Sequence, residues 1–141
     1  MSSSKSPSFL LHQKFPFEPT PSQVQLFEKL SGFILNQDEW APLTFIIKGY
    51  AGTGKTTVIS TLIKVLGSFE YKTQLIAPTG RAAKVMANYS KKKASTIHKK
   101  IYRQVSNPSS GSLIFQRMNN YATNTVFIVD EASMITDEAE F

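Results

Sequence analysis

The stretch Lys48–Thr57, KGYAGTGKTT, carries the strongest chemical signal in the chain. Gly49 and Gly54 have four residues between them and are followed by a lysine and a hydroxyl residue, which is the spacing of a phosphate-binding loop. Glycine lets the backbone curl until successive N–H groups face one anion, and a helix N-terminus adds partial positive charge. A glycine-rich turn with a chance lysine is the alternative. The pattern predicts a triphosphate site at Gly49, Ala51, Gly52, Thr53, Gly54, Lys55, Thr56 and Thr57.

A nucleoside triphosphate held by such a loop needs Mg²⁺, and Mg²⁺ needs oxygen ligands. We expect Lys55 to reach the β- and γ-phosphates and the Thr56 hydroxyl to bind the metal. A second ligand is expected at the end of a buried strand, where Thr125–Val129 runs into Asp130 and Glu131. Asp130 would hold the metal and Glu131 would orient or deprotonate a water, which favours hydrolysis over kinase transfer. A strand that simply ends in solvent is the alternative for this acid pair.

The surrounding pattern predicts the elements that would position these groups. Short apolar runs predict strands, helical spacing of apolar residues predicts helices, and Pro, Gly, Ser and Asn mark loops. The predicted strands are Leu43–Lys48, Lys72–Ala77 and Thr125–Val129, all buried, with a short strand or hairpin within Leu113–Asn120. The predicted helices are Gln23–Leu35 capped by Ser22, Lys55–Leu66 stopped by Gly67, Gly80–Tyr89 and Ala94–Val105. Alternating strands and helices predict an α/β domain with a parallel sheet flanked by helices.

The chain of 141 residues is long enough for one domain with a hydrophobic core. We expect residues 1–19 to be disordered or extended and residues 20–141 to form one incomplete domain, with a small insertion at about 106–122. Cysteine is absent, which excludes disulfides and thiolate metal sites. No apolar run approaches the length of a membrane span, and no signal peptide is recognisable, so we expect a cytoplasmic protein without a membrane partner.

Charge is distributed unevenly along the chain. The net charge is +6, and the interval between Glu70 and Asp130 contains ten lysines and arginines and no acidic residue. Such a stretch favours a polyanionic partner, of which nucleic acid is the commonest, although a solvated basic surface is the alternative. The three lysines Lys91–Lys93 fit a solvated loop better than a specific contact. Tyr89, Tyr102 and Tyr121 lie among the basic residues and would either stack on bases or pack in the core.

Four motifs, GYAGTGKTT, APTGRAAK, STIHKKIY and VDEASMI, resemble in this order those of RecD/Dda-like DNA helicases of superfamily 1, which are P-loop AAA-family ATPases. The resemblance covers roughly Thr20 to Ile135. It implies a RecA-like sheet, ATP and Mg²⁺ as cofactors, and coupling of ATP hydrolysis to 5′→3′ movement on single-stranded DNA. It also implies a role in DNA repair or recombination, in bacteria.

The resemblance further implies roles for individual residues. Gln23 would read adenine, with Gln25 as a rival and a plain surface glutamine as the alternative. Lys55 and Glu131 would be catalytic. The implied DNA contacts are Pro78, Thr79, Gly80, Arg81, Thr96 and His98. Thr79 would also cap a helix, Arg81 would serve either DNA or the nucleotide, and His98 has a structural role as its alternative.

The later motifs of this family and its second RecA-like domain are not found in the sequence. We therefore expect an N-terminal portion of a longer helicase, with an interrupted sheet and little hydrolysis of its own, because translocation requires two domains closing on ATP. Two other functions stay open, a non-catalytic nucleic-acid-binding remnant and another P-loop enzyme such as a kinase. DNA and RNA cannot be told apart by contacts to phosphate.

Overall fold

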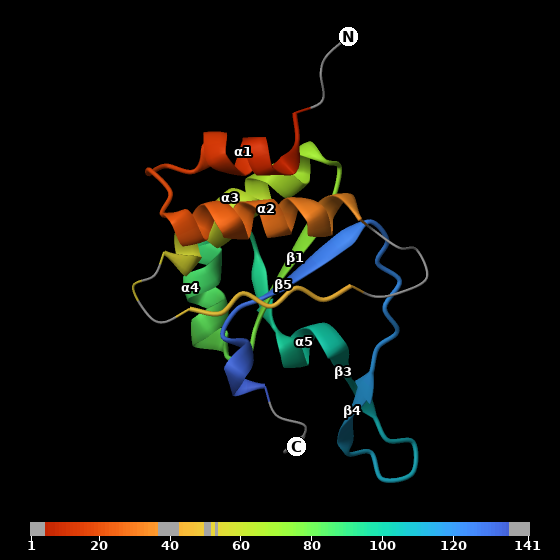
Figure 1. The fold of residues 1–141 in the computed structure, drawn as a ribbon. Helices are drawn as coiled ribbons and strands as arrows, with labels where there is room; N and C mark the ends of the chain where they lie inside the picture. Colours follow the sequence, from red (N-terminus) through yellow and green to blue (C-terminus); the bar gives the residue numbers. More distant parts are fainter. Residues whose placement is uncertain (1–4, 37–42, 50–51, 53, 136–141) are drawn as a thin grey trace. The chain divides into compact units, whose positions relative to one another are not determined.

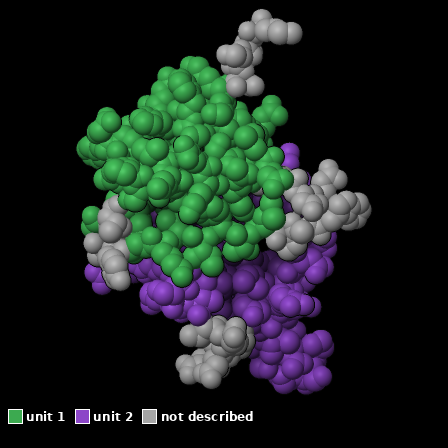
Figure 2. All heavy atoms as spheres, viewed as in Figure 1, with its two compact units in different colours: residues 1–70 green, residues 71–141 purple. Residues whose placement is uncertain are grey.

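The computed structural model describes residues 5–36, 43–49, 52 and 54–135. The chain divides into two compact units, residues 1–70 and residues 71–141, which Figure 2 shows in green and purple. Figure 1 draws the helices and strands of both units and labels most of them.

The first unit begins with helix α1, Pro7–Lys14, where the sequence predicts a disordered or extended segment. That prediction is wrong for these residues. Ser6 caps the helix by accepting a hydrogen bond from the N–H of Phe9, and proline occupies the first helical position, where its missing N–H costs nothing. Leu11 is completely buried, and α1 packs against both other helices of the unit. Tertiary burial therefore orders a stretch whose composition alone predicts disorder.

Helix α2 spans Pro21–Leu35 and is capped by Thr20, not by Ser22 as predicted. Thr20 and Gln23 form a capping box, in which the Thr20 hydroxyl accepts from the N–H of Gln23 and the Gln23 Oε1 accepts from the N–H of Thr20. Two otherwise unpaired N–H groups are satisfied in this way, so the helix starts earlier than its apolar pattern indicates. Its inner face buries Phe27, Leu30 and Ile34.

Helix α3, Lys55–Ser68, starts directly after Gly54, as the phosphate-loop pattern predicts. It runs through Gly67, which the sequence predicts as its end. A single glycine costs a helix about 1 kcal/mol, and the packed face of α3 outweighs that cost. The buried residues of this face are Val58, Leu62, Ile63, Val65 and Leu66.

The predicted buried strand Leu43–Lys48 is not a strand in the described part of the chain. Residues 43–49 belong to neither sheet, and Ile46 is 72% exposed. A strand is defined by hydrogen bonds to a neighbouring strand. An apolar run predicts burial, but it does not show whether a neighbouring strand is present to form those bonds.

The second unit contains a three-stranded parallel sheet in the order β2–β1–β5, which confirms the predicted α/β class. Strand β1 is Lys72–Ala77, β2 is Ala94–Thr96 and β5 is Thr125–Val129. Leu75 of β1 pairs with Ala94 on one side and with Ile128 on the other. The core of the sheet is β1, where Leu75, Ile76 and Ala77 are buried. Strand β5 is less buried than predicted, since Phe127 and Val129 are 37% and 38% exposed.

Helix α4, Gly80–Ser90, follows β1 and packs against it and β2, with Met86 and Ala83 buried. The predicted helix Ala94–Val105 is wrong. This stretch forms β2, a short helix α5 at Ile97–Ile101 and strand β3 at Tyr102–Ser106.

Strand β3 pairs with β4, Leu113–Arg117, as an antiparallel hairpin. The short strand predicted within Leu113–Asn120 is therefore confirmed, and its partner strand lies before this range. The pairing of β3 with β4 competes with continuation of the helix. The stretch Ala94–Val105 contains most of β3 but none of β4. A prediction from this stretch alone therefore cannot take the pairing of the two strands into account.

The short 3₁₀ helix η1 at Ala132–Met134 follows β5. Among the described residues, no helix is both long enough and apolar enough to cross a membrane.

Candidate nucleotide-binding site

The loop before α3 has the backbone geometry of an anion site. Gly52 and Gly54 adopt φ of +81° and +82°, in the left-handed region that glycine enters without steric cost. Gly54 is the N-cap of α3 and provides no side-chain hydrogen bond, so the first N–H groups of the helix are not capped by a side chain. Together with the helix dipole, these N–H groups suit a phosphate. The predicted residues Ala51 and Thr53 lie outside the described residues.

The side chain of Lys55 lies against the loop, where its Nζ donates a hydrogen bond to the carbonyl oxygen of Gly49. Lys55 and Thr56 are both exposed. An exposed ammonium group at the first position of the helix can exchange this carbonyl for a phosphate oxygen. The loop residues that the structure describes therefore fit a triphosphate.

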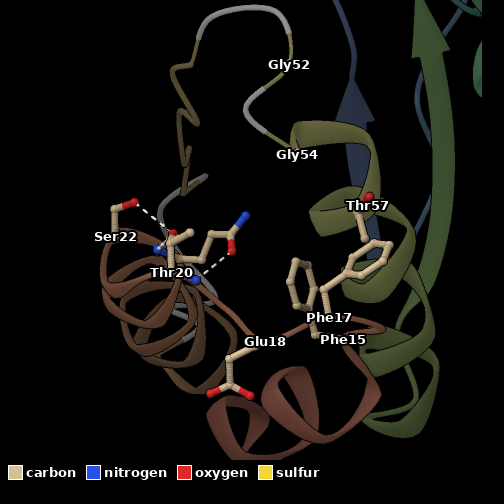
Figure 3. Close-up of a pocket in the computed structure, with 9 residues that line it drawn as sticks. Phe15, Phe17, Glu18, Thr20, Ser22, Gly52, Gly54 and Thr57 are labelled. Carbon is tan, nitrogen blue, oxygen red and sulfur yellow. Dashed lines mark hydrogen bonds between the residues drawn. The ribbon is translucent and has the colours of Figure 1, made fainter.

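Gln23 is brought to the same loop. An open pocket of about 500 Å³ is lined by Thr20, Gln23, Gly52, Gly54 and Thr57, together with Phe15, Phe17, Glu18 and Ser22 (Figure 3). The Gln23 Oε1 is held by the N–H of Thr20 at 2.9 Å. The Nε2 lies so close to Gly54 that a Cβ atom there would approach it to 3.1 Å. Gln23 thus combines a helix-capping role with a position beside the phosphate loop.

The rival, Gln25, is exposed and lines a second, neighbouring pocket of about 360 Å³. That pocket also contains Lys48 and Lys55 but none of the glycines of the loop that the structure describes. The position of Gln23 next to Gly54 therefore favours Gln23 over Gln25, while contact with adenine stays a prediction.

The acid pair follows β5 in the second unit. The N–H of Asp130 donates to the carbonyl of Ile76 at 3.1 Å, which extends the ladder between β5 and β1 by one residue. The Asp130 Oδ1 accepts from the N–H of Glu131 at 2.9 Å, and its Oδ2 accepts from the hydroxyl of Tyr89 at 2.8 Å. Glu131 is exposed and has φ of +53°, a conformation that is uncommon for a residue with a side chain. The chain turns sharply here, directly after the strand.

Burial raises the pKa of the Tyr89 phenol well above its ordinary value, and the hydrogen bond to Asp130 and the charges of Asp130 and Glu131 raise it further. The phenol therefore stays protonated and donates to the carboxylate. The sequence suggests base stacking or core packing for Tyr89, and it does not predict this bond, because the two partners lie 41 residues apart. No local pattern connects them.

The predicted DNA-contacting residues cluster at one edge of the sheet. Strands β1 and β2 are parallel neighbours and Ala77 pairs with Thr96. The segment Pro78–Arg81, which follows β1, and Thr96, the last residue of β2, therefore lie at adjacent strand ends. Thr79 caps α4 by accepting from the N–H of Ala82 at 3.1 Å, and Thr96 caps α5 by accepting from the N–H of Lys99 at 3.1 Å. Asp130 lies at the same edge, because β5 is parallel to β1 on its other side.

His98 is exposed, and its ring packs against Phe115 at 4.6 Å and Tyr102 at 5.1 Å between centroids. These contacts join α5 to the hairpin. They support a structural role for His98, which is the alternative to its predicted contact with DNA. Tyr102 belongs to this cluster, whereas Tyr121 is 84% exposed.

The residues predicted for the ATP site belong to both units. The phosphate loop, Lys55, Thr56 and Gln23 lie in the first unit, and Asp130 and Glu131 lie in the second. Convergence of Thr56 and Asp130 on one Mg²⁺ stays a prediction.

The family model of the AAA domain matches residues 36–140, which is more than half of the chain and includes both the phosphate loop and the acid pair. No curated protein and no solved structure matches the chain. Domains of this type are P-loop NTPases and typically bind ATP with Mg²⁺. The positive-φ glycines and the lysine at the start of α3 fit that description, and the chain belongs to the AAA domain family of P-loop NTPases.

Proposed function

We propose that the chain is the ATP-binding portion of an ATP-dependent DNA helicase of the RecD/Dda-like group, corresponding to its first RecA-like domain. AAA domains of this type often occur in such helicases. The observation that carries the proposal is the shared sheet edge, where the Pro78–Arg81 segment, Thr96 and Asp130 lie at the ends of three adjacent parallel strands. A motor must connect nucleic-acid contacts to nucleotide chemistry, and adjacent strand ends provide a short connection.

Each residue has a defined task in this proposal. The N–H groups at the start of α3 and Lys55 bind the β- and γ-phosphates, and Gln23 contacts the adenine. Thr56 and Asp130 would hold Mg²⁺, which when bound neutralises charge on the phosphates. Glu131 orients or deprotonates the attacking water.

The proposed partner is single-stranded DNA. Thr79, Gly80, Arg81 and Thr96 would contact its phosphates through N–H groups, hydroxyls and a guanidinium group, with Pro78 and His98 beside them. The 5′→3′ direction, a role in DNA repair or recombination, and a bacterial, cytoplasmic location rest on the motif resemblance. Movement would further require a second RecA-like domain, because translocation depends on two domains closing on ATP.

The proposal is tested by measuring binding of labelled ATP with Mg²⁺ to the parent chain and to Lys55→Ala. We expect binding to the parent chain and a loss of about tenfold or more in the variant, since a charge-assisted bond to phosphate is removed. Lys64→Ala, an exposed lysine on the same helix, is the matched control and should bind like the parent. Equal binding by all three proteins contradicts a functional phosphate loop.

A second measurement separates the alternatives. Stimulation of ADP release by single-stranded DNA supports the helicase assignment, whereas stimulation by a nucleoside or sugar acceptor supports a kinase. Binding of DNA without any binding of ATP supports a non-catalytic remnant.

A further inference from the structure

The hydrogen bond between Tyr89 and Asp130 joins two segments that no motif in the chain connects. Tyr89 lies in the last turn of α4, beyond the APTGRAAK motif and before the STIHKKIY motif. Its hydroxyl donates to the Asp130 Oδ2 at 2.8 Å, and the phenol is half-buried. We propose that Tyr89 is a positioning residue, which fixes the orientation of the Asp130 carboxylate for binding of the nucleotide's Mg²⁺. This proposal rests on the function proposed above.

The Asp130 carboxylate lies where the chain leaves the sheet. The N–H of Asp130 makes the last hydrogen bond of β5 to β1, and Glu131, which follows it, turns away in a left-handed conformation. The N–H of Glu131 holds the Oδ1, but this bond comes from the adjacent residue and moves with the turn. The bond from Tyr89 comes from a distant element instead, and it therefore ties the Oδ2 to the body of the unit.

The support for Tyr89 itself is rigid. Helix α4 is anchored by Thr79 at its start and by the buried side chains Ala83 and Met86, and it packs against β1 and β2. A phenol carried by a packed helix holds its partner more firmly than a group on a loop would.

The bond also leaves the carboxylate able to bind a metal. An ionised carboxylate offers about four lone-pair positions, and the two observed bonds use one on each oxygen. Hydrogen bonds of this kind commonly orient carboxylate ligands, and their removal weakens metal binding.

The test uses the full chain and a fluorescent ATP analogue, mant-ATP. Its affinity is measured over a series of MgCl₂ concentrations and in EDTA. We expect Tyr89→Phe to raise the Mg²⁺ concentration that gives the half-maximal effect by about tenfold or more, which is the scale of one hydrogen bond to a charged group. Affinity in EDTA should stay unchanged, because Tyr89 acts through the carboxylate of Asp130, which has no metal ion to bind when EDTA is present. Tyr121→Phe removes the hydroxyl of a tyrosine that is 84% exposed and serves as the matched control.

A double-mutant cycle separates positioning from a structural role. If Tyr89 acts through Asp130, Tyr89→Phe should cause no further change in an Asp130→Asn background, and both single variants should keep the thermal midpoint of the parent within a few degrees. An unchanged Mg²⁺ requirement in Tyr89→Phe, or an equal shift in both backgrounds, overturns the proposal and leaves the proposed function intact. Absence of any Mg²⁺-dependent binding by the parent chain overturns both.

Discussion

Gln23 shows how one side chain can serve stability and recognition at once. Its Oε1 is committed to the N–H of Thr20, so the acceptor of the amide already has a partner. Its Nε2 faces Gly54 of the phosphate loop. A glutamine in a capping box is a sufficient explanation for the residue, and only a substitution that preserves the cap can reveal a second role.

Glutamate is that substitution, because it keeps the acceptor of the capping box and removes the Nε2 donor. We expect Gln23→Glu to leave the thermal midpoint close to that of the parent, and Gln23→Ala to destabilise the chain by about 0.5–1 kcal/mol. Both variants should lose preference for ATP over 7-deaza-ATP, which lacks the N7 acceptor, since neither variant can donate to adenine N7. The ratio of the two affinities is the proper readout, because the charge of Glu weakens both equally. An unchanged ratio in Gln23→Glu would leave Gln23 with a capping role alone.

Single residues are predictable from the sequence where their type has a strict physical consequence. Gly52 and Gly54 have the positive φ that a phosphate loop demands, and Thr79 caps α4 as its type and position indicate. The roles of Thr20 and Tyr89 are not predictable in this way. Ser22 is as good a cap as Thr20 by composition, and the bond between Tyr89 and Asp130 depends on the packing of α4 against the sheet.

Helix α1 is the element that departs furthest from expectation, and its packing determines what it contributes. Leu11 is completely buried and Phe15 is 8% exposed, whereas Phe9 on the same helix is 50% exposed. Phe15 also contacts Phe27 of α2 edge to face, with 5.3 Å between ring centroids. The segment is therefore part of the core of the first unit.

Truncation of a fully buried leucine leaves a cavity in addition to losing transfer free energy. We expect Leu11→Ala to lower the free energy of unfolding by about 2–5 kcal/mol, and Phe9→Ala to lower it by less than about 1 kcal/mol. Urea denaturation followed by circular dichroism measures both. Equal, small effects of the two substitutions would show that α1 does not stabilise the unit.

Elements are predicted well where local pattern and final environment agree. Strands β1 and β5 have the predicted bounds, since both are apolar, β-rich runs with a parallel partner. Residues 43–48 have the same apolar character, but they pair with no strand among the described residues. Residues 94–105 have a helical sequence pattern, but the pairing of β3 with β4 prevents one continuous helix from forming. In both cases the deciding interaction is distant in sequence.

At the scale of the whole molecule, the charge distribution bears most directly on the proposed partner. The ten cations of the acid-free stretch all lie in the second unit, which also contains the predicted DNA contacts. Lys91, Lys92 and Lys93 are exposed, and Lys92 Nζ lies 3.4 Å from the Thr73 hydroxyl. If this surface meets a nucleic-acid backbone, each contact releases counterions and makes binding salt-dependent.

Substitution of all three lysines by alanine should weaken binding of labelled oligothymidine, measured by fluorescence anisotropy over a range of salt concentrations. The slope of log K against log salt should become shallower by about 0.7 for each phosphate that the variant no longer neutralises, and binding of ATP should be unchanged. A matched variant replaces the exposed lysines Lys14, Lys29 and Lys64 of the first unit, so that both proteins lose three charges from a net charge of +6.

The comparison between the two triple variants distinguishes a local contact of Lys91–Lys93 with DNA from a general attraction of DNA by the net charge of the protein. A larger loss of affinity in the Lys91–Lys93 variant places the DNA backbone beside this loop. Equal losses would mean that net charge alone attracts the polyanion, because long-range attraction depends on total charge more than on its location. No loss in either variant would make Lys91–Lys93 a solvated surface, and the DNA contacts would then rest on Thr79, Arg81 and Thr96 at the sheet edge.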